Sequence, residues 1–272
     1  VRIVSDQANR DADRDARRVR NAVREYGQLL SGLRVVARGV NPQALQAISI
    51  DEVDVSTPSG RSAMLLGMMS YFFIFAALMG GMYLAIDSTA GERERGSLEP
   101  LLSLPVTRSQ LIYGKIAATC LFMTLSLALS LTAFYFVLDF MPLEQLGMTP
   151  NFDLPVLVSA LLLFLPFVLL GGALMTLVAS FTKSYREAQT WLSVVLIAPT
   201  MPILIVSILM LRPRTEFMFI PSLSQHLLLV DMVKNEPLNG LHVAISVAST
   251  LVMGLILTWV CARLYRREGL LG

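Results

Sequence analysis

Charged residues are scarce in this chain: Asp, Glu, Lys and Arg together make up 15% of its 272 residues, where an ordinary soluble domain has about a quarter. The shortage excludes disordered, collagen-like and strongly nucleic-acid-binding proteins. Cysteine is nearly absent as well, and two cysteines cannot form a disulfide framework. Hydrophobic residues make up 54% of the chain, and this balance is typical of a membrane protein.

Charge is missing above all from five long stretches that contain no Asp, Glu, Lys or Arg. A helix rises about 1.5 Å per residue, so roughly 20 apolar residues cross the ~30 Å hydrocarbon core of a bilayer. Five buried helices of this kind in a soluble protein would need a core larger than this chain can surround. We therefore predict an all-α polytopic membrane protein whose spans are residues 62–86, 116–138, 154–181, 188–211 and 241–262.

Basic residues in the short loops predict the orientation, because cytoplasmic loops carry an excess of Lys and Arg. The loop between the second and third spans has neither, whereas the loops after the first and third spans and the C-terminal tail contain Arg93, Arg95, Arg108, Lys115, Lys183, Arg186, Arg263, Arg266 and Arg267. We therefore expect these loops and the C-terminus on the cytoplasmic side of the cell membrane, and residues 1–61 outside. An outside start followed by five spans leads us to expect a sixth span upstream.

Residues 1–61 are predicted to be the C-terminal part of an extracytoplasmic α+β domain, and residues 62–272 to form the transmembrane domain. Apolar residues recur every three or four positions over 11–36, which predicts a surface helix. Short strands are expected around 48–55 and at 1–5. The basic face of the helix is a candidate for binding an acidic partner, but a solvated face with Asp–Arg pairs is the preferred interpretation.

The connection between the first two spans, residues 87–110, is much longer than the roughly 2–8 residues that join antiparallel helices. Glu92 and Arg95 have the three-residue spacing of an ion pair on a helical extension of the first span, and Gly96 is placed to end that extension. Leucines at helical spacing follow and predict a short helix, and a capping box at Thr107 begins the next span. We favour protein docking by this loop over a helix resting on lipid headgroups, because its charges are balanced rather than basic.

Two runs in these loops resemble ABC-2 type transporter permeases. The first is GERERGSLEPLL, from Gly91 to Leu102, and the second is SFTKSYREAQT, from Ser180 to Thr190. Within that family the likeness is to NatB-type permeases of sodium-exporting ABC systems, and it extends from about Tyr26 to the end of the chain. The resemblance implies a six-span permease subunit with a large outside domain after its first span.

The same resemblance implies how such a transporter works. Two permease chains, identical or different, would assemble with two cytoplasmic ABC ATPase subunits that bind ATP and Mg, and closure of the ATPase pair would rock the spans between inward- and outward-facing states. The first cytoplasmic loop would hold the coupling helix, which lies in a groove of the ATPase. The residues implied in ATPase coupling are Glu92, Arg93, Glu94, Arg95, Leu98, Glu99, Leu101 and Leu102. Membrane lipid is the other expected partner, and we expect no nucleic acid and no cofactor bound by this chain.

The loop between the last two spans, residues 213–240, contains an apolar stretch too short to cross the bilayer. A capping box at Ser222 begins it, and similar permeases have re-entrant helices here that close the pathway from outside. His226 and Asp231 are candidates for an ion site. A capped helix with Asp231 paired to Lys234 is the preferred interpretation, so no metal ligands are assigned.

The sequence does not predict an enzyme. It contains no Walker A, HExxH or GxSxG motif, and Cys120 and Cys261 have no His partner near them in the sequence. We therefore predict a non-catalytic permease subunit of an ATP-driven ABC-2 exporter, with sodium as a candidate cargo.

A secondary transporter or channel without an ATPase partner is the alternative. Proline and glycine interrupt spans at Pro166, Gly171 and Pro199, as in such carriers, but the absence of charged residues from the spans weakens this interpretation. Span hydroxyls have two uses, cation coordination or, more commonly, interhelical hydrogen bonding. The candidates are Thr119, Thr124, Ser126, Ser130 and Thr132.

Overall fold

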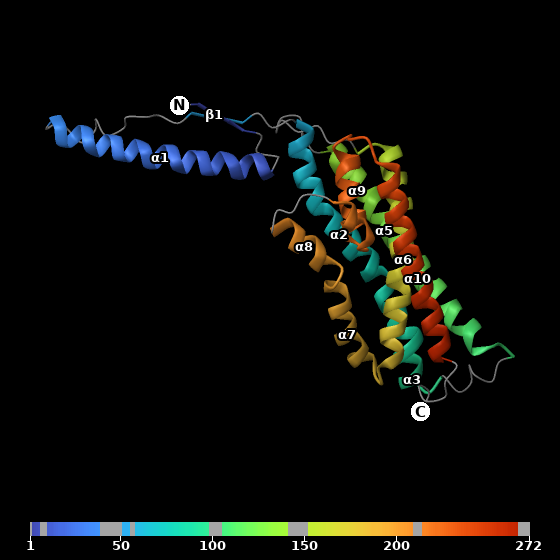
Figure 1. Cartoon of the computed structure of the whole chain (residues 1–272). Helices are drawn as coiled ribbons and strands as arrows, with labels where there is room; N and C mark the ends of the chain where they lie inside the picture. The colour runs from blue at the N-terminus through green and yellow to red at the C-terminus, as the bar shows by residue number, and fades with distance from the viewer. Residues whose placement is uncertain are drawn as a thin grey trace.

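The structure is a computed structural model that describes residues 2–5, 10–38, 51–54, 58–97, 105–140, 152–208 and 214–265. Long apolar helices run side by side through most of it (Figure 1). The helices of the bundle are α2 (Pro58–Ile86), α5 (Arg108–Phe140), α6 (Leu154–Phe181), α7 (Tyr185–Ile197), α8 (Thr200–Ile208), α9 (Leu223–Val233) and α10 (Gly240–Tyr265), with a 3-10 turn, η4 (Thr215–Phe219), before α9.

Five segments are long and apolar enough to cross a membrane: Met68–Glu94, Arg108–Phe140, Leu154–Phe181, Tyr185–Val206 and Gly240–Tyr265. They coincide with the five predicted spans, so the all-α polytopic membrane fold is confirmed. Large apolar side chains such as Leu121 and Leu129 on α5 face outward, as expected of a surface that contacts lipid rather than water.

The first and fourth spans depart from simple helices. The first continues from α2 through a π-helical turn, η2 (Asp87–Gly91), into the short α3 (Glu92–Glu94). The fourth stops at Ile197 and resumes at Thr200 in another direction (Figure 1). Pro199 lies in the break, and its lack of an N–H removes the hydrogen bond that a continuous helix would make there.

Residues before the first span form the long helix α1 (Arg10–Arg38) and two four-residue strands, β1 (Arg2–Ser5) and β2 (Asp51–Asp54), which pair in parallel. The predicted helix and both strands are therefore present. The predicted α+β domain is not supported, because in the described residues the sheet has only these two strands and α1 is exposed along nearly all of the length for which side chains are described.

Glycines let α2, α5, α6 and α10 approach one another closely. A Cβ on Gly80 of α2 would lie 2.3 Å from the Cβ of Ser126 on α5, and a Cβ on Gly172 of α6 would lie 2.6 Å from the Sγ of Cys120. Gly81, Gly171 and Gly254 are restricted in the same way. The bundle is therefore held by small residues at helix contacts, as is common where lipid replaces water outside.

The bundle has two ends that differ in chemistry. The α3 end contains α3, the start of α5, the end of α6 and the start of α7, and the opposite α9 end contains the start of α2 and the short helix α9 (Figure 1). The basic loops that predict the orientation all lead to the α3 end. Which end faces the cytoplasm stays a prediction.

Candidate functional site

The first span ends at Gly96, as the sequence predicts. Gly96 has a positive φ of 68°, its N–H donates to the carbonyl of Arg93 at 3.1 Å, and the N–H of Ser97 donates to the carbonyl of Glu92 at 3.0 Å. This pair of bonds is the Schellman arrangement that satisfies the last carbonyls of a helix. It fixes the direction in which the run from Glu92 to Arg95 projects.

Arg93 binds the C-terminal end of α6. Its Nη1 donates to the carbonyl of Thr182 at 2.9 Å, and its Nη2 donates to the carbonyl of Ser180 at 3.1 Å. The last carbonyls of a helix have no partner within the helix and carry partial negative charge, so a guanidinium is a favourable partner for them. Arg93 therefore ties the first span to the third.

Glu94 binds the N-terminal end of α7. Its Oε2 accepts a 2.7 Å hydrogen bond from the N–H of Tyr185, the first residue of that helix. The side chains of Ser184 and Glu187 accept two further backbone N–H groups in the same turn. A carboxylate is favourable here because the first N–H groups of a helix are unpaired and carry partial positive charge.

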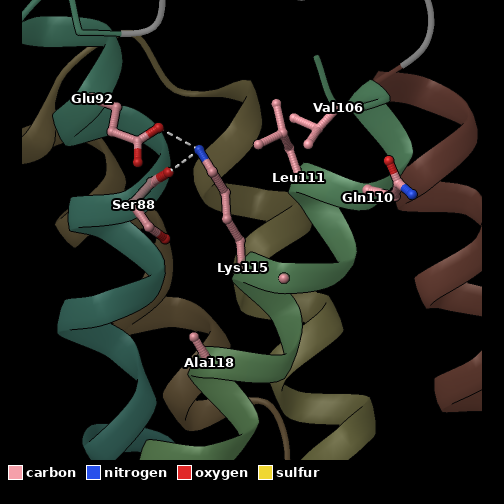
Figure 2. Close-up of a pocket in the computed structure, with 8 residues that line it drawn as sticks. Ser88, Glu92, Val106, Gln110, Leu111, Lys115 and Ala118 are labelled. Carbon is pink, nitrogen blue, oxygen red and sulfur yellow. Dashed lines mark hydrogen bonds and ion pairs between the residues drawn. The ribbon is translucent and has the colours of Figure 1, made fainter. Parts of the chain in front are cut away.

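Glu92 pairs with Lys115 on α5 beside a small cavity. The Lys115 ammonium donates to the Glu92 carboxylate and to the carbonyl of Ser88 (Figure 2). The side chains of Lys115 and Glu92 are only 9% and 19% exposed. The pair lies on one wall of a cavity of about 340 Å³ whose other lining residues are Val106, Gln110, Leu111, Gly114 and Ala118.

The predicted ion pair between Glu92 and Arg95 is wrong. Arg95 instead donates to the Asp87 carboxylate at 2.8 Å, while Glu92 pairs with Lys115. This hydrogen bond, together with the charge of Asp87, raises the pKa of the Arg95 guanidinium. Both side chains are more than half exposed, so water screens the pair.

The run from Glu92 to Glu94 thus contacts the ends of three other helices, which sequence reasoning did not anticipate. Lys115 was the available signal, because a lysine at the border of an apolar span needs a partner. The remaining residues of the predicted coupling set, Leu98, Glu99, Leu101 and Leu102, lie outside the described residues. The role of the whole set in ATPase coupling stays a prediction.

The start of α5 agrees with the sequence. The N–H of Thr107 donates to Oε1 of Gln110 at 2.9 Å, and the N–H of Gln110 donates to Oγ1 of Thr107 at 3.3 Å. This capping box holds the first turn of α5 beside Glu92, with the side chains of Val106 and Leu111 close together (Figure 2).

The α9 end is held by neutral polar groups instead. Gln225 donates from Nε2 to Oγ1 of Thr250 at 3.0 Å and accepts from the N–H of Ser222 at 2.7 Å, while Ser246 donates to Ser224 at 2.8 Å. All five side chains are fully buried. They join the first turn of α9 to α10, and they include the predicted bond between Ser222 and Gln225.

His226 and Asp231 do not come together as an ion site. His226 Nδ1 lies 2.5 Å from the hydroxyl of the buried Ser70 on α2. Lys234 forms its ion pair with Glu236, at 3.9 Å, rather than with Asp231. Among the described residues, no group of three or more His, Cys, Asp or Glu is placed to hold a metal ion.

The hydroxyls of α5 mostly bond within their own helix. Thr119, Thr124 and Ser130 each donate to the carbonyl four residues earlier, at 2.8–2.9 Å. Ser126 donates across to the carbonyl of Ala76 on α2 at 2.8 Å, beside the close approach at Gly80. The bond of Ser126 holds α5 against α2, and the other three are local to α5.

Comparisons with known proteins agree with this architecture. The family model described as ABC-2 family transporter protein matches residues 15–263. The ABC transporter permease protein NatB of Bacillus subtilis (strain 168) is 26% identical over 194 residues, which cover 68% of this chain and 48% of that protein. The chain therefore spans about half the length of this curated relative. With a family match over most of its length and five membrane-length helices, the chain belongs to the ABC-2 transporter family as a multi-pass membrane permease subunit.

Proposed function

We propose that this permease subunit works in an ATP-driven exporter and that its α3 end faces the cytoplasm, where it docks a separate ATPase subunit. The observation that carries the proposal is the set of contacts made by Glu92, Arg93 and Glu94. They reach α5, the end of α6 and the start of α7, so a displacement of this run is passed to most of the spans. The leucines from Leu98 to Leu102 follow directly in the chain and are proposed to enter the ATPase.

The family relationship supports the rest of the assembly. ATP and Mg would bind to the partner ATPase, whose closure would move the spans of two permease chains as rigid bodies. Sodium is the narrower proposal for the cargo, taken from the resemblance to NatB-type permeases. Residues 1–61 would then lie outside the cell and the C-terminus inside.

Copurification tests the docking proposal directly. Replacing Leu101 and Leu102 together by Glu should abolish recovery of the ATPase subunit with the permease, because two carboxylates would have to be desolvated at the contact. The same change at Leu270 and Leu271 in the C-terminal tail is the matched control and should leave recovery unchanged. Full recovery of the ATPase with the first variant would contradict the assigned role of the loop.

A vesicle assay tests the cargo. Purified transporter in proteoliposomes should export sodium only when the ATPase subunit and ATP are present, and drugs and lipids should be compared in the same vesicles. Absence of sodium flux would remove the narrower proposal, and flux without the ATPase would identify a channel or secondary transporter instead.

A further inference from the structure

We propose that α7 transmits movement from the α3 end to α9, and that Glu94 and Ser222 are the positioning residues that hold its two ends. The inference rests on the proposed function, because the movement would begin where an ATPase docks. It gives the fourth span a role in transmitting movement, which neither its length nor its apolar composition indicates.

The lower end of α7 is fixed by one charged contact from another span. Glu94 accepts the N–H of Tyr185 at 2.7 Å, and the neighbouring Arg93 holds the carbonyls of Ser180 and Thr182 just before it. The loop that enters α7 is therefore bound by Arg93 at its beginning and by Glu94 at its end. A shift of the run from Glu92 to Glu94 must move the start of α7.

The upper end of α7 is fixed by a neutral contact. The hydroxyl of Ser222 donates to the carbonyl of Pro199 at 2.6 Å, in the break between α7 and α8. The bond therefore links the residue before α9 to the break in the fourth span. Ser222 is fully buried and is the residue immediately before α9, whose first turn is in turn bound to α10 through Gln225 and Thr250.

Between these two contacts α7 is a continuous helix of 13 residues, about 20 Å long. Its outer face is largely free of contacts within the described part of the chain: Trp191, Val194 and Ile197 are each more than half exposed. The bundle helices beside it, by contrast, meet at glycines that leave no space. Because α7 is bound to other spans at both ends and open along this face, a displacement of one end can be carried lengthwise to the other.

Hydrogen exchange in the complete transporter, with its ATPase subunits and ATP plus vanadate, tests the inference without knowledge of the cargo. In the unmodified protein, nucleotide should change amide exchange both in peptides around Glu92–Glu94 and in peptides covering α9. Ser222→Gly should keep the first change and lose most of the second, and Glu94→Ala should also lose most of the second. Gly suits position 222 because its φ is 70°, which favours glycine, so this variant is expected to fold.

Two variants serve as controls. Glu94→Gln keeps an oxygen that can accept the Tyr185 N–H and should retain the α9 response. A retained response would show that the protein still folds and binds the ATPase after a change at this position. Ser193→Ala removes a hydroxyl of α7 that donates only to its own helix, at the carbonyl of Gln189, and should also retain it. The double variant Glu94→Ala with Ser222→Gly should lose no more than either single variant, because both break the same connection.

The failures are distinguishable. If nucleotide leaves exchange around Glu92–Glu94 unchanged in the unmodified transporter, the proposed docking is wrong and the transmission through α7 with it. If that region responds but α9 still responds in Glu94→Ala and Ser222→Gly, docking stands and the role of α7 is overturned.

Discussion

The two ends of the bundle are held together by different chemistry. At the α3 end the contacts are charged: Lys115 with Glu92, Arg93 with helix carbonyls and Glu94 with a helix N–H. At the α9 end the fully buried contacts are hydroxyls and one amide, centred on Gln225. A charge within a membrane bundle is costly, whereas a hydroxyl can be satisfied by one or two bonds. At the α3 end the exposed Glu94 can exchange its partner for water, whereas the buried hydrogen bonds at the α9 end must break without water to replace them.

The largest effect is expected from breaking the nearly buried ion pair between Lys115 and Glu92. Lys115→Met should lower the free energy of unfolding by about 3 kcal/mol, because it leaves the Glu92 carboxylate nearly buried without its partner. Denaturant unfolding of the purified protein in detergent measures it. Arg95→Met removes the exposed pair with Asp87 and should cost about 0.5 kcal/mol or less. Equal losses in the two variants would show that burial does not separate these pairs.

A smaller loss of stability is expected from a substitution at the α9 end. Gln225→Leu removes a donor to Thr250 and an acceptor for Ser222, and it should lower the free energy of unfolding by about 2 kcal/mol, because buried polar groups then lack partners. Gln189→Leu on the exposed side of α7 is the control and should be nearly neutral. An unchanged Gln225→Leu variant would mean that water reaches the α9 end as it reaches the other.

Replacing glycine by alanine should have opposite effects on stability at two positions of the α3 end, Gly96 and Gly114. Gly96→Ala should destabilise the protein by about 1 kcal/mol, because Ala is strained at its positive φ. Gly114→Ala, within α5 where nothing lies near a new Cβ, should stabilise by roughly 0.5–1 kcal/mol. Thermal unfolding of both variants provides the measurement, and two changes of the same sign would contradict the assigned stop.

The smallest effect concerns Asp231, a partly buried carboxyl group at the α9 end. Burial, helped by Glu236 and opposed by Lys234 and His242, raises the pKa of the Asp231 carboxyl above its usual value. Folding therefore favours its protonated form, so stability should rise as the pH falls from neutral through this raised pKa towards about 4, its unfolded value.

Asp231→Asn should remove that increase, and melting temperature against pH, compared between the two proteins, measures it. Asp139→Asn, at an exposed carboxylate on the same end of the bundle, is the control. A melting curve that keeps the full pH dependence in Asp231→Asn would exclude this residue as its source.

Much of the fold follows from local sequence. Apolar length predicts all five spans, and local capping patterns correctly predict the helix stop at Gly96, the start of α5 at Thr107 and the bond between Ser222 and Gln225. In each case the partners lie within a few residues of one another, so helix geometry alone determines the contact.

The contacts that hold the ends together could not be predicted in the same way. Arg93 reaches Thr182, and Glu94 reaches Tyr185, across about ninety residues of chain, and these pairs depend on how the spans pack. The expected pair between Glu92 and Arg95 fails for the same reason, since Lys115 and Asp87 offer better-placed charges. The residues Leu98, Glu99, Leu101 and Leu102 lie outside the described part, so their contacts remain predictions.

The close approach at Gly80 and Gly172 also bears on the route that a cargo takes. Where one added methyl group would collide with a neighbouring helix, neither a hydrated ion nor a lipid tail can slip between α2, α5 and α6. If this chain moves a cargo as proposed above, the route would have to run along another face of the bundle. The glycines would then mark a closed seam between these helices.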